Sequence, residues 1–378
     1  MSSRPLRLLV INWRDPNNPL AGGAEIRFVE LFSRFLKKGH EVSLLCAGYP
    51  GSSFKERWNG FEIYRVGGEY TFQWEAPRFY LSRFKHQPFD LVIEMMNKVP
   101  LYTPWVVRHR LLVMVDHLFG KIAFMELPWP LASYVVLSES LIPFCYRRSP
   151  MLVYSEGTKA DLIRRGIPER SIALIYNGVD AHTYFPDPLI RKTEFPSVLY
   201  LGRLKRYKRV DLLLSAFLPV FKKEPRAKLI IAGKGDDLLR LQRWVGKLSL
   251  DGAVEFKGHV SEGEKRELLR SSWILAVPSV REGWGMVSLE AEACGTPVLV
   301  AGSPGIRETV EEGVSGFVVR GNSPSTFTEK ILLLLQDEAL RKRLSEGAVA
   351  FSRRFQWDLC ADQTMALIER LRSQDGTA

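Results

Sequence analysis

The sequence predicts an α/β protein with two successive parallel sheets, and three observations support this. Short apolar or β-branched runs alternate with segments of helical period, which is typical of parallel strands joined by helices. The alternation starts again near Ser197, after a polar, proline-bearing stretch over residues 180–196. The chain has 378 residues, whereas one domain usually takes about 100–200. We therefore expect two domains of similar size.

In the first half, one βαβ unit is the clearest element. Ala24 to Lys38 places Ile26, Val29, Phe32, Phe35 and Leu36 on one helical face, and Gly39 ends the helix. Strands are expected on either side of this helix and further along the half, at Leu6–Asn12, Glu41–Cys46, Phe61–Val66, Asp90–Met95, Leu111–Val115 and Ile172–Tyr176.

In the second half, strands and helices continue to alternate. Strands are expected at Ser197–Leu201, Lys228–Ala232, Val254–Lys257, Trp273–Val277, Pro297–Ala301 and Phe317–Val319. Helices are expected at Val210–Lys222, Asp236–Lys247, Glu264–Arg270, Met286–Cys294, Pro324–Leu335, Glu338–Phe351 and Leu359–Leu371. In such sheets ligands bind beyond the carboxyl ends of the strands, so we expect the active site in a cleft between the two domains.

Composition excludes several classes of protein. Hydrophobic residues make up 46% and charged residues 25%, which excludes disordered, collagen-like and multi-spanning membrane chains. The four cysteines lie far apart without a CxxC pattern, so neither a zinc site nor a disulfide framework is indicated. The apolar run Leu8 to Ile11 is too short for a signal peptide. We expect a cytoplasmic protein whose contact with membranes, if any, is peripheral, at the inner face of the cell membrane.

The net charge of +11 calls for an anionic partner. Nucleic acid, a lipid surface and a phosphorylated ligand all meet that description. No helix-turn-helix, RRM or KH signature accompanies the charge, so we expect no nucleic-acid partner. Residues 1–185 hold 23 basic and 17 acidic residues, a net +6, and the remainder carries +5, so both halves share the excess.

Gly22 and Gly23 open the first helix after a strand and a loop. Glycines there let backbone approach a phosphate, and the free N–H groups of the helix face it. A tight turn chosen for steric reasons explains the pair equally well. No GxGxxG or GxxxxGK[ST] motif is present.

A more specific pattern follows the strand at Ser197–Leu201. Gly202 and Arg203 end that strand, and Lys208 stands at the start of the next helix. Two cations at the end of a strand suit a diphosphate, whose charge they neutralise as it departs. The alternative is a solvated basic turn, which explains the charges but not the Gly-Arg placement.

Residues 278–298, PSVREGWGMVSLEAEACGTPV, carry a second specific pattern. An apolar strand runs into a Gly-x-Gly loop and a helix, with Glu282 on the loop and Glu290 in the helix. Carboxylates accept hydrogen bonds from hydroxyls, and helix N–H groups between them can hold phosphate. Together with Arg203 and Lys208, this describes a site for a sugar joined to a nucleoside diphosphate.

These motifs resemble those of the retaining family 4 glycosyltransferases of GT-B fold, with two Rossmann-like domains facing across a cleft. The signature PSxxEGWGxxxxEAxACGxPV is accompanied by matching segments in family order along nearly the whole chain. They stand at 22–25 (GGAE), 39–42 (GHEV), 155–159 (SEGTK), 177–180 (NGVD), 202–208 (GRLKRYK), 233–235 (GKG), 256–258 (FKG) and 312–316 (EGVSG). The resemblance implies an N-terminal acceptor-binding domain at 1–188 and a C-terminal nucleotide-sugar-binding domain at 189–354, with a final helix at about 355–378 packed back on the first.

The resemblance also implies roles for single residues. Arg203 and Lys208 would hold the donor diphosphate, Glu290 the donor ribose, and Glu282 the transferred sugar. Gly22 and Gly23 would border the phosphates from the first domain. The family often has a catalytic histidine after a strand in that domain, and here His117 follows Asp116, the reverse of the commoner order. A strand-end histidine without chemistry is the alternative. The remaining implied donor-binding positions are Gly233, Val260, Gly283, Trp284, Gly285 and Met286.

The reaction that the resemblance implies is transfer of a hexose such as mannose or glucose from a UDP- or GDP-sugar, with retention of configuration. The acceptor would be a hydroxyl of a lipid-linked or cell-envelope glycan. No cofactor and no metal are expected, because Arg203 and Lys208 supply the positive charge. Asp236 and Asp237 could suggest a metal-binding acidic pair. They open a predicted helix, however, and we expect them to stabilise its N-terminus instead. An epimerase or a phosphorylase on the same fold is the competing hypothesis.

The basic and aromatic segment Trp74 to His86 suggests contact with an anionic bilayer. It contains Arg78, Arg83 and Lys85 among Phe79, Tyr80 and Phe84. A helix that packs its aromatic side chains inward and leaves its arginines in solvent is the alternative, and the sequence favours neither.

Overall fold

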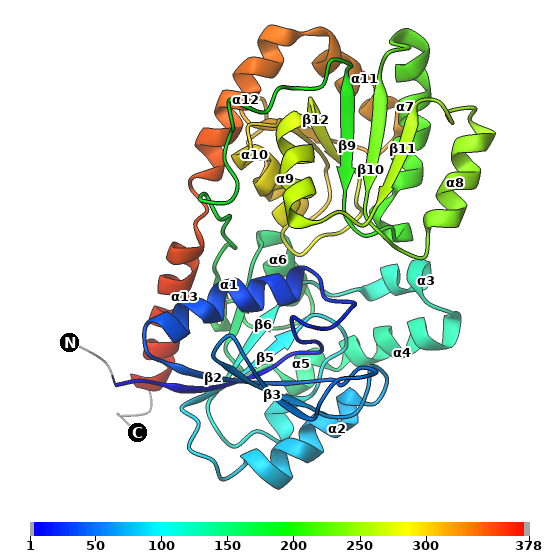
Figure 1. Ribbon diagram of the computed structural model, residues 1–378. Coiled ribbons are helices and arrows are strands. Elements are labelled where there is room, and N and C mark those ends of the chain that lie inside the picture. Colours follow the sequence, from blue (N-terminus) through cyan, green and yellow to red (C-terminus); the bar gives the residue numbers. More distant parts are fainter. Residues whose placement is uncertain (1–3, 374–378) are drawn as a thin grey trace. The chain divides into compact units, whose positions relative to one another are not determined.

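The computed structural model describes residues 4–373 and consists of two compact units (Figure 1). The first unit contains the described residues up to Asn177 and those from Trp357 onwards, and the second runs from Gly178 to Gln356. Residues 178–188 therefore belong to the second unit, whereas the sequence analysis put them in the first. The Val179 amide donates to the Phe355 carbonyl (3.1 Å), and the Tyr184 hydroxyl donates to Glu262 (2.9 Å).

The first unit is built on an eight-stranded sheet, counted within the described residues. All neighbouring strands are parallel except the first pair, which is an antiparallel hairpin. The hairpin strand 55–58 and the short strand 151–153 were not predicted. In spatial order the strands are β3 (Lys55–Trp58), β4 (Phe61–Arg65), β2 (Glu41–Cys46), β1 (Arg7–Ile11), β5 (Leu91–Met96), β6 (Leu111–Val115), β7 (Met151–Val153) and β8 (Ile172–Leu174).

Helices cover both faces of this sheet (Figure 1). The terminal helix α13 packs against α1, and the Arg34 guanidinium binds Asp358 across the pair at 2.6 Å. Residues from the end of the chain therefore complete the first unit. Its α-helices are α1 (Gly23–Lys37), α2 (Phe72–Phe79), α3 (Ala123–Glu126), α4 (Trp129–Ser140), α5 (Ile142–Cys145), α6 (Glu156–Arg164) and α13 (Trp357–Ser373).

The buried face of α1 differs from the predicted one. Phe28 and Leu31 lie in the core beside the predicted Phe32 and Phe35, while Ile26 is exposed. The face is rotated because the first turn also buries charged groups that hydrogen-bond inside the unit, Glu25 and Arg27.

The second unit has a six-stranded, wholly parallel sheet within the described residues. Its strand order is the doubly wound 3-2-1-4-5-6, which places the end of the first strand at the switch point where ligands bind. The strands are β11 (Val254–Gly258), β10 (Lys228–Ala232), β9 (Ser197–Leu201), β12 (Ile274–Val277), β13 (Val298–Ala301) and β14 (Gly316–Val319). The helices are α7 (Val210–Lys223), α8 (Leu238–Lys247), α9 (Glu262–Ser271), α10 (Met286–Ala293), α11 (Pro324–Gln336) and α12 (Glu338–Ser352).

The segment 74–86 is only partly the helix that the sequence predicted. The α2 helix ends at Phe79, and a π-helical turn follows at Tyr80–Phe84. Tyr80 and Phe84 are fully buried in the core of the first unit, while Arg78 and Arg83 are exposed. The inward-packing alternative therefore describes these two aromatic side chains.

All four cysteines are buried and unbonded to one another. Over residues 4–373, no helix combines the length and the apolar character needed to cross a bilayer.

Candidate active site

The loops after β9, β10 and β11 are joined at one edge of the second sheet. The Gly202 amide donates to the Ala232 carbonyl (3.0 Å), and the Gly233 amide donates to the Gly258 carbonyl (2.6 Å). A Cβ atom on Gly233 would lie 1.9 Å from the Gly202 carbonyl oxygen, at a φ of 141°. The backbones approach so closely that only glycine fits at position 233.

Arg203 and Lys208 lie on the loop that follows β9. This loop contains a 3₁₀ helix at Arg206–Lys208, which ends at Arg209 with a left-handed φ of 54°. The Arg203 guanidinium donates to the Tyr207 hydroxyl (3.2 Å), and the Tyr200 hydroxyl donates to the Arg203 carbonyl (2.9 Å). Hydrogen bonds with two buried tyrosines, Tyr200 and Tyr207, thus fix the position of Arg203.

Lys208 is bound to Glu282, which lies 74 residues further along the chain. The Lys208 ammonium is 2.5 Å from Glu282 Oε1, and the two side chains are only 13% and 15% exposed. The Val280 amide also donates to the Tyr207 carbonyl (3.0 Å), which joins the two loops. The structure therefore brings together the two motifs that the sequence analysis singled out.

The charge of Lys208 is maintained despite burial. Burial lowers the pKa of its ammonium, but the Glu282 carboxylate and Tyr207 outweigh this effect and raise the pKa above its ordinary value. The other lysine of this loop behaves as the basic-turn interpretation expects, since Lys205 pairs with Asp236 at the surface. Lys208 is thus a buried, permanently charged cation.

The loop 283–286 turns the chain from Glu282 into α10. Gly285 caps the helix with a left-handed φ of 100°, and a Cβ there would lie 2.3 Å from the Ile306 side chain. Gly283 and Met286 are half-buried. Trp284 is 3% exposed and its ring packs edge-on against Phe355, with centroids 5.3 Å apart. Its indole is therefore part of the core, which leaves the backbone of 284 as the group available to a donor.

Glu290 lies on α10 and pairs with a residue that the sequence analysis did not identify. Its Oε1 accepts from the Lys265 ammonium at 2.9 Å. Burial raises the pKa of the Glu290 carboxyl, although Lys265 opposes that shift. Lys265 gave no signal in the sequence because it occupies an ordinary position in a charged helix. Val260 is half-buried in the turn between β11 and α9.

Gly22 and Gly23 start α1 in the first unit, and the Glu25 side chain caps that start. The Gly22 amide donates to Glu25 Oε2 at 2.7 Å, and Asn12 donates to Glu25 Oε1 at 3.3 Å. Gly22 has an extended backbone, and an added Cβ would come no closer than 4.0 Å to any described atom. Steric demand within the described residues therefore does not explain glycine at position 22.

His117 follows β6 and is half-buried, with its ring centroid 5.1 Å from that of Phe119. The preceding residue is firmly held: Asp116 Oδ2 accepts from the Arg27 guanidinium at 2.7 Å, and the Asp116 carbonyl accepts from the Thr158 hydroxyl at 2.9 Å. Arg27 lies on α1, so His117 and the Gly22–Gly23 turn are connected through one buried ion pair.

The acidic pair at 236–237 takes part in ion pairs at the start of α8, with Asp236 exposed and Asp237 buried. Asp237 binds Arg240 at 2.6 Å, and Asp236 binds Lys205 at 2.7 Å. Among residues 4–373, no group of three or more His, Cys, Asp or Glu side chains is arranged to hold a metal ion.

Two family models match the chain, one on each half. "Glycosyltransferase Family 4" matches residues 21–183, and "Glycosyl transferases group 1" matches residues 185–350. The chain belongs to glycosyltransferase family 4. Its two α/β units are those of the GT-B fold.

Relatives of similar sequence match part of the chain. A D-inositol 3-phosphate glycosyltransferase of Streptomyces bingchenggensis is 31% identical over 194 residues, which are 47% of this chain and 43% of the relative. The chain thus spans less than half of that relative's length.

Two solved structures resemble the whole chain in fold. Sucrose-phosphate synthase of Thermosynechococcus elongatus has a TM-score of 0.82 at 21% identity, over 98% of this chain and 100% of that one. HepE of Anabaena, in complex with UDP and glucose, has a TM-score of 0.78 at 18% identity, over 97% and 100%.

One buried carboxyl on α10 has no evident role in the site. Glu292 is completely buried, and within the described chain neither of its oxygens accepts a hydrogen bond of normal geometry. Burial raises the pKa of the Glu292 carboxyl well above its ordinary value of 4.5; the Ser315 hydroxyl opposes the shift and the Glu311 charge adds to it. Glu292 is therefore protonated in the fold at pH values where it is ionised in the unfolded chain.

We expect Glu292→Gln to stabilise the protein at neutral pH. A carboxyl with a raised folded pKa favours folding below its unfolded pKa and loses that contribution as pH rises through the folded value. The melting temperature of the variant should exceed that of the wild type by a margin that grows as pH rises above about 4.5. Glu329→Gln, at an exposed carboxylate of α11, serves as control and should show no such trend. A margin that does not change with pH would contradict the assignment.

Proposed function

We propose that the enzyme transfers a hexose, such as mannose or glucose, from a UDP- or GDP-sugar to a hydroxyl of a lipid-linked or cell-envelope glycan, with retention at the anomeric carbon. The observation that carries this proposal is the buried pair of Lys208 and Glu282 beside Arg203. A diphosphate needs cations, and a hexose needs a hydrogen-bond acceptor for its hydroxyls. The second unit supplies both at the carboxyl end of its first strand.

In this proposal Arg203 and Lys208 hold the donor diphosphate and neutralise the charge that develops as it leaves. Preorganised charge of this kind is commonly the largest single contribution to catalysis. Glu282 accepts from hydroxyls of the transferred sugar, and Glu290 accepts from the ribose. The backbone of the 283–286 loop, together with Gly233 and Val260, lies beside them.

The reaction then needs no metal, because two side-chain cations supply the positive charge. The acceptor hydroxyl attacks the anomeric carbon on the face from which the diphosphate departs. On the first unit, Gly22 and Gly23 are assigned to the donor phosphates, because backbone N–H groups at the start of a helix suit an anion. His117 is assigned to the reacting sugar, and the Arg27–Asp116 pair holds the residue before it.

The test is a screen of UDP- and GDP-hexoses for binding, followed by incubation with lipid-linked glycans and analysis of the products. We expect release of the nucleoside diphosphate together with an α-linked product from an α-linked donor, and the same rate in EDTA. Isomerised donor or phosphorolysis would indicate an epimerase or a phosphorylase instead. An inverted linkage would overturn the retaining assignment, and loss of turnover in EDTA would overturn the metal-independent one.

A further inference from the structure

The helices α4 and α5 of the first unit form one nearly continuous rod with an apolar outer side. Leu141 ends α4 and begins α5 in helical conformation. Exposed apolar side chains recur along the rod at spacings of three or four residues, so they share one helical face. We call this the α4–α5 face; its members are Leu131, Tyr134, Leu137, Leu141 and Phe144. Leu137 is 64% exposed and Phe144 81%.

The inner side of the same rod is occupied by the core of the unit. Ala132, Val135 and Ile142 are buried. Glu139, the acidic residue of α4, is also buried, where it accepts from the Phe119 and Gly120 amides at 2.6 and 2.8 Å. A surface helix normally presents a polar side to solvent. This rod instead exposes mainly apolar side chains, with Ser140 as an exposed polar exception, which indicates that something covers its outer side.

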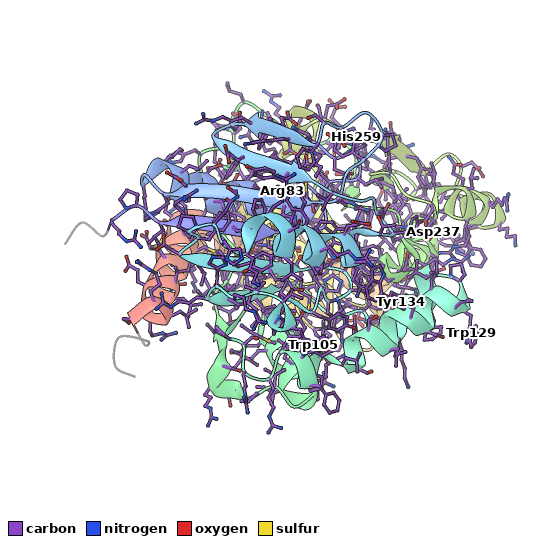
Figure 2. All side chains as sticks on the ribbon, turned by 90° about the horizontal axis from the view of Figure 1, so that it is seen from below. Arg83, Trp105, Trp129, Tyr134, Asp237 and His259 are labelled. Atoms are coloured by element: carbon purple, nitrogen blue, oxygen red, sulfur yellow. The ribbon has the colours of Figure 1, made fainter. Side chains whose placement is uncertain are left out.

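Two exposed tryptophans lie close to the α4–α5 rod. Trp129 is 73% exposed at the start of α4, and Trp105 is 62% exposed. The Tyr102 ring stacks on Trp105 with centroids 5.4 Å apart, and its hydroxyl donates to the Ser138 carbonyl of α4 at 3.1 Å. Figure 2 shows Trp129 and Tyr134 along α4, with Trp105 nearby.

The exposed charged side chains in the stretch of chain that contains the face, residues 101–150, are all positive. Within residues 101–150 the acidic side chains are buried or half-buried: Asp116, Glu126 and Glu139. The exposed charged residues of the same stretch are Arg108, Arg110, Lys121, Arg147 and Arg148.

This charge pattern indicates what covers the α4–α5 face. An apolar helix face with tryptophans and a cationic fringe suits the interface of an anionic bilayer. A symmetric dimer through the same face would bring like charges together. The charge therefore favours a membrane over a second copy of the chain.

We propose that the α4–α5 face docks the protein on an anionic bilayer, with Leu137 and Phe144 entering the boundary between headgroups and acyl chains and Arg147 and Arg148 binding lipid phosphates. The proposal does not rest on the identity of the donor or acceptor. It replaces the 74–86 segment as the membrane surface, since Tyr80 and Phe84 of that segment lie in the core.

Flotation with phosphatidylcholine vesicles containing about one-third phosphatidylglycerol tests the proposal. The wild type should float with these vesicles and not with phosphatidylcholine alone. Leu137→Gln/Phe144→Gln should raise the lipid concentration for half-binding about tenfold or more. Arg147→Gln/Arg148→Gln should do so roughly tenfold at low salt.

Two matched controls should bind as the wild type does. Leu189→Gln/Leu239→Gln changes leucines of the second unit that are 90% and 66% exposed, and Arg78→Gln/Arg83→Gln changes two exposed cations of the 74–86 segment. Loss of binding in the Arg78→Gln/Arg83→Gln variant with retention in the α4–α5 variants would overturn the proposal. Thermal melts should show all variants folded, because each changed side chain is exposed.

A second measurement reports insertion directly. The native cysteines are buried, so Leu137→Cys can be labelled selectively with an environment-sensitive fluorophore. Its emission should shift to the blue on anionic vesicles, and that of Leu239→Cys should not. Failure of the wild type to float, or a concentration-dependent dimer that Leu137→Gln/Phe144→Gln dissociates without any effect on lipid, would overturn the proposal.

Discussion

Replacing Lys208 with methionine is expected to lower kcat/KM by about 100- to 1000-fold, as loss of one preorganised charge at a reacting centre typically does. The Lys208 side chain is buried against Glu282 and keeps its proton. The methionine side chain is similar in length to that of lysine, but it lacks the charge that would meet the leaving diphosphate. Steady-state kinetics and calorimetry with the nucleoside diphosphate measure the two effects.

Lys205→Met is the matched control, because Lys205 stands on the same loop but pairs with Asp236 at the surface. It should change kcat/KM by less than about twofold. Lys208→Met leaves the Glu282 carboxylate without its ion-pair partner, which destabilises the fold. The double variant Lys208→Met/Glu282→Gln removes that cost and should recover stability without recovering activity. Recovery of activity in the double variant would show that Lys208 only balances Glu282.

Arg203→Ala and Glu282→Ala are expected to reduce turnover severely as well, through loss of the second cation and of the sugar contact. Full activity in all three single variants at Arg203, Lys208 and Glu282 would remove the site assignment.

Substituting Gly233 with alanine is expected to cost about 3 kcal/mol or more of folding free energy and to abolish donor binding. The added Cβ would lie 1.9 Å from the Gly202 carbonyl oxygen, so the loops after β9 and β10 must separate. That separation displaces the loop that carries Arg203 and Lys208. Urea unfolding of the second unit and titration with the nucleoside diphosphate measure both losses.

Gly258→Ala is the control that separates the cost of a positive φ from the cost of a steric clash. Gly258 has a positive φ of 68° but no atom within 4 Å of an added Cβ. Its substitution should therefore cost only the conformational penalty, about 1–2 kcal/mol. Equal losses of stability in the two variants would refute the claim that close backbone approach is what requires glycine at position 233.

The order and type of the regular elements were largely predictable because the pattern is local. The periodicity of α1 and the apolar strands of both sheets placed most elements within a residue or two of their observed ends. The hairpin strand β3 was missed because its residues alternate between exposed and half-buried and include charged residues. The short strand β7 has only three residues, too few for a period to be visible.

The proposed donor-site residues could be recognised as separate motifs, but the sequence did not show which of them would meet. Arg203 and Lys208 share a loop, whereas Glu282 reaches Lys208 only because β9 and β12 are neighbours in the sheet. The role of Lys265 could not be predicted from the sequence, because this residue lies in a polar helix. It becomes a partner of Glu290 only when α9 packs on α10. The sequence also did not show that the Trp284 ring is buried, because the ring packs on Phe355, which lies 71 residues further along the chain.

By itself, the sequence determined the two α/β halves, the family and the residue types that a nucleotide-sugar site requires, since these follow from periodicity and from motifs along the chain. Only the tertiary structure decided which side chains meet, which aromatic residues enter the core and where a bare apolar face remains. The burial of a side chain depends on neighbours that are distant in the chain, and the local sequence pattern does not show which residues these are. For that reason Tyr80 and Phe84 lie inside the first unit while Leu137 and Phe144 face outward.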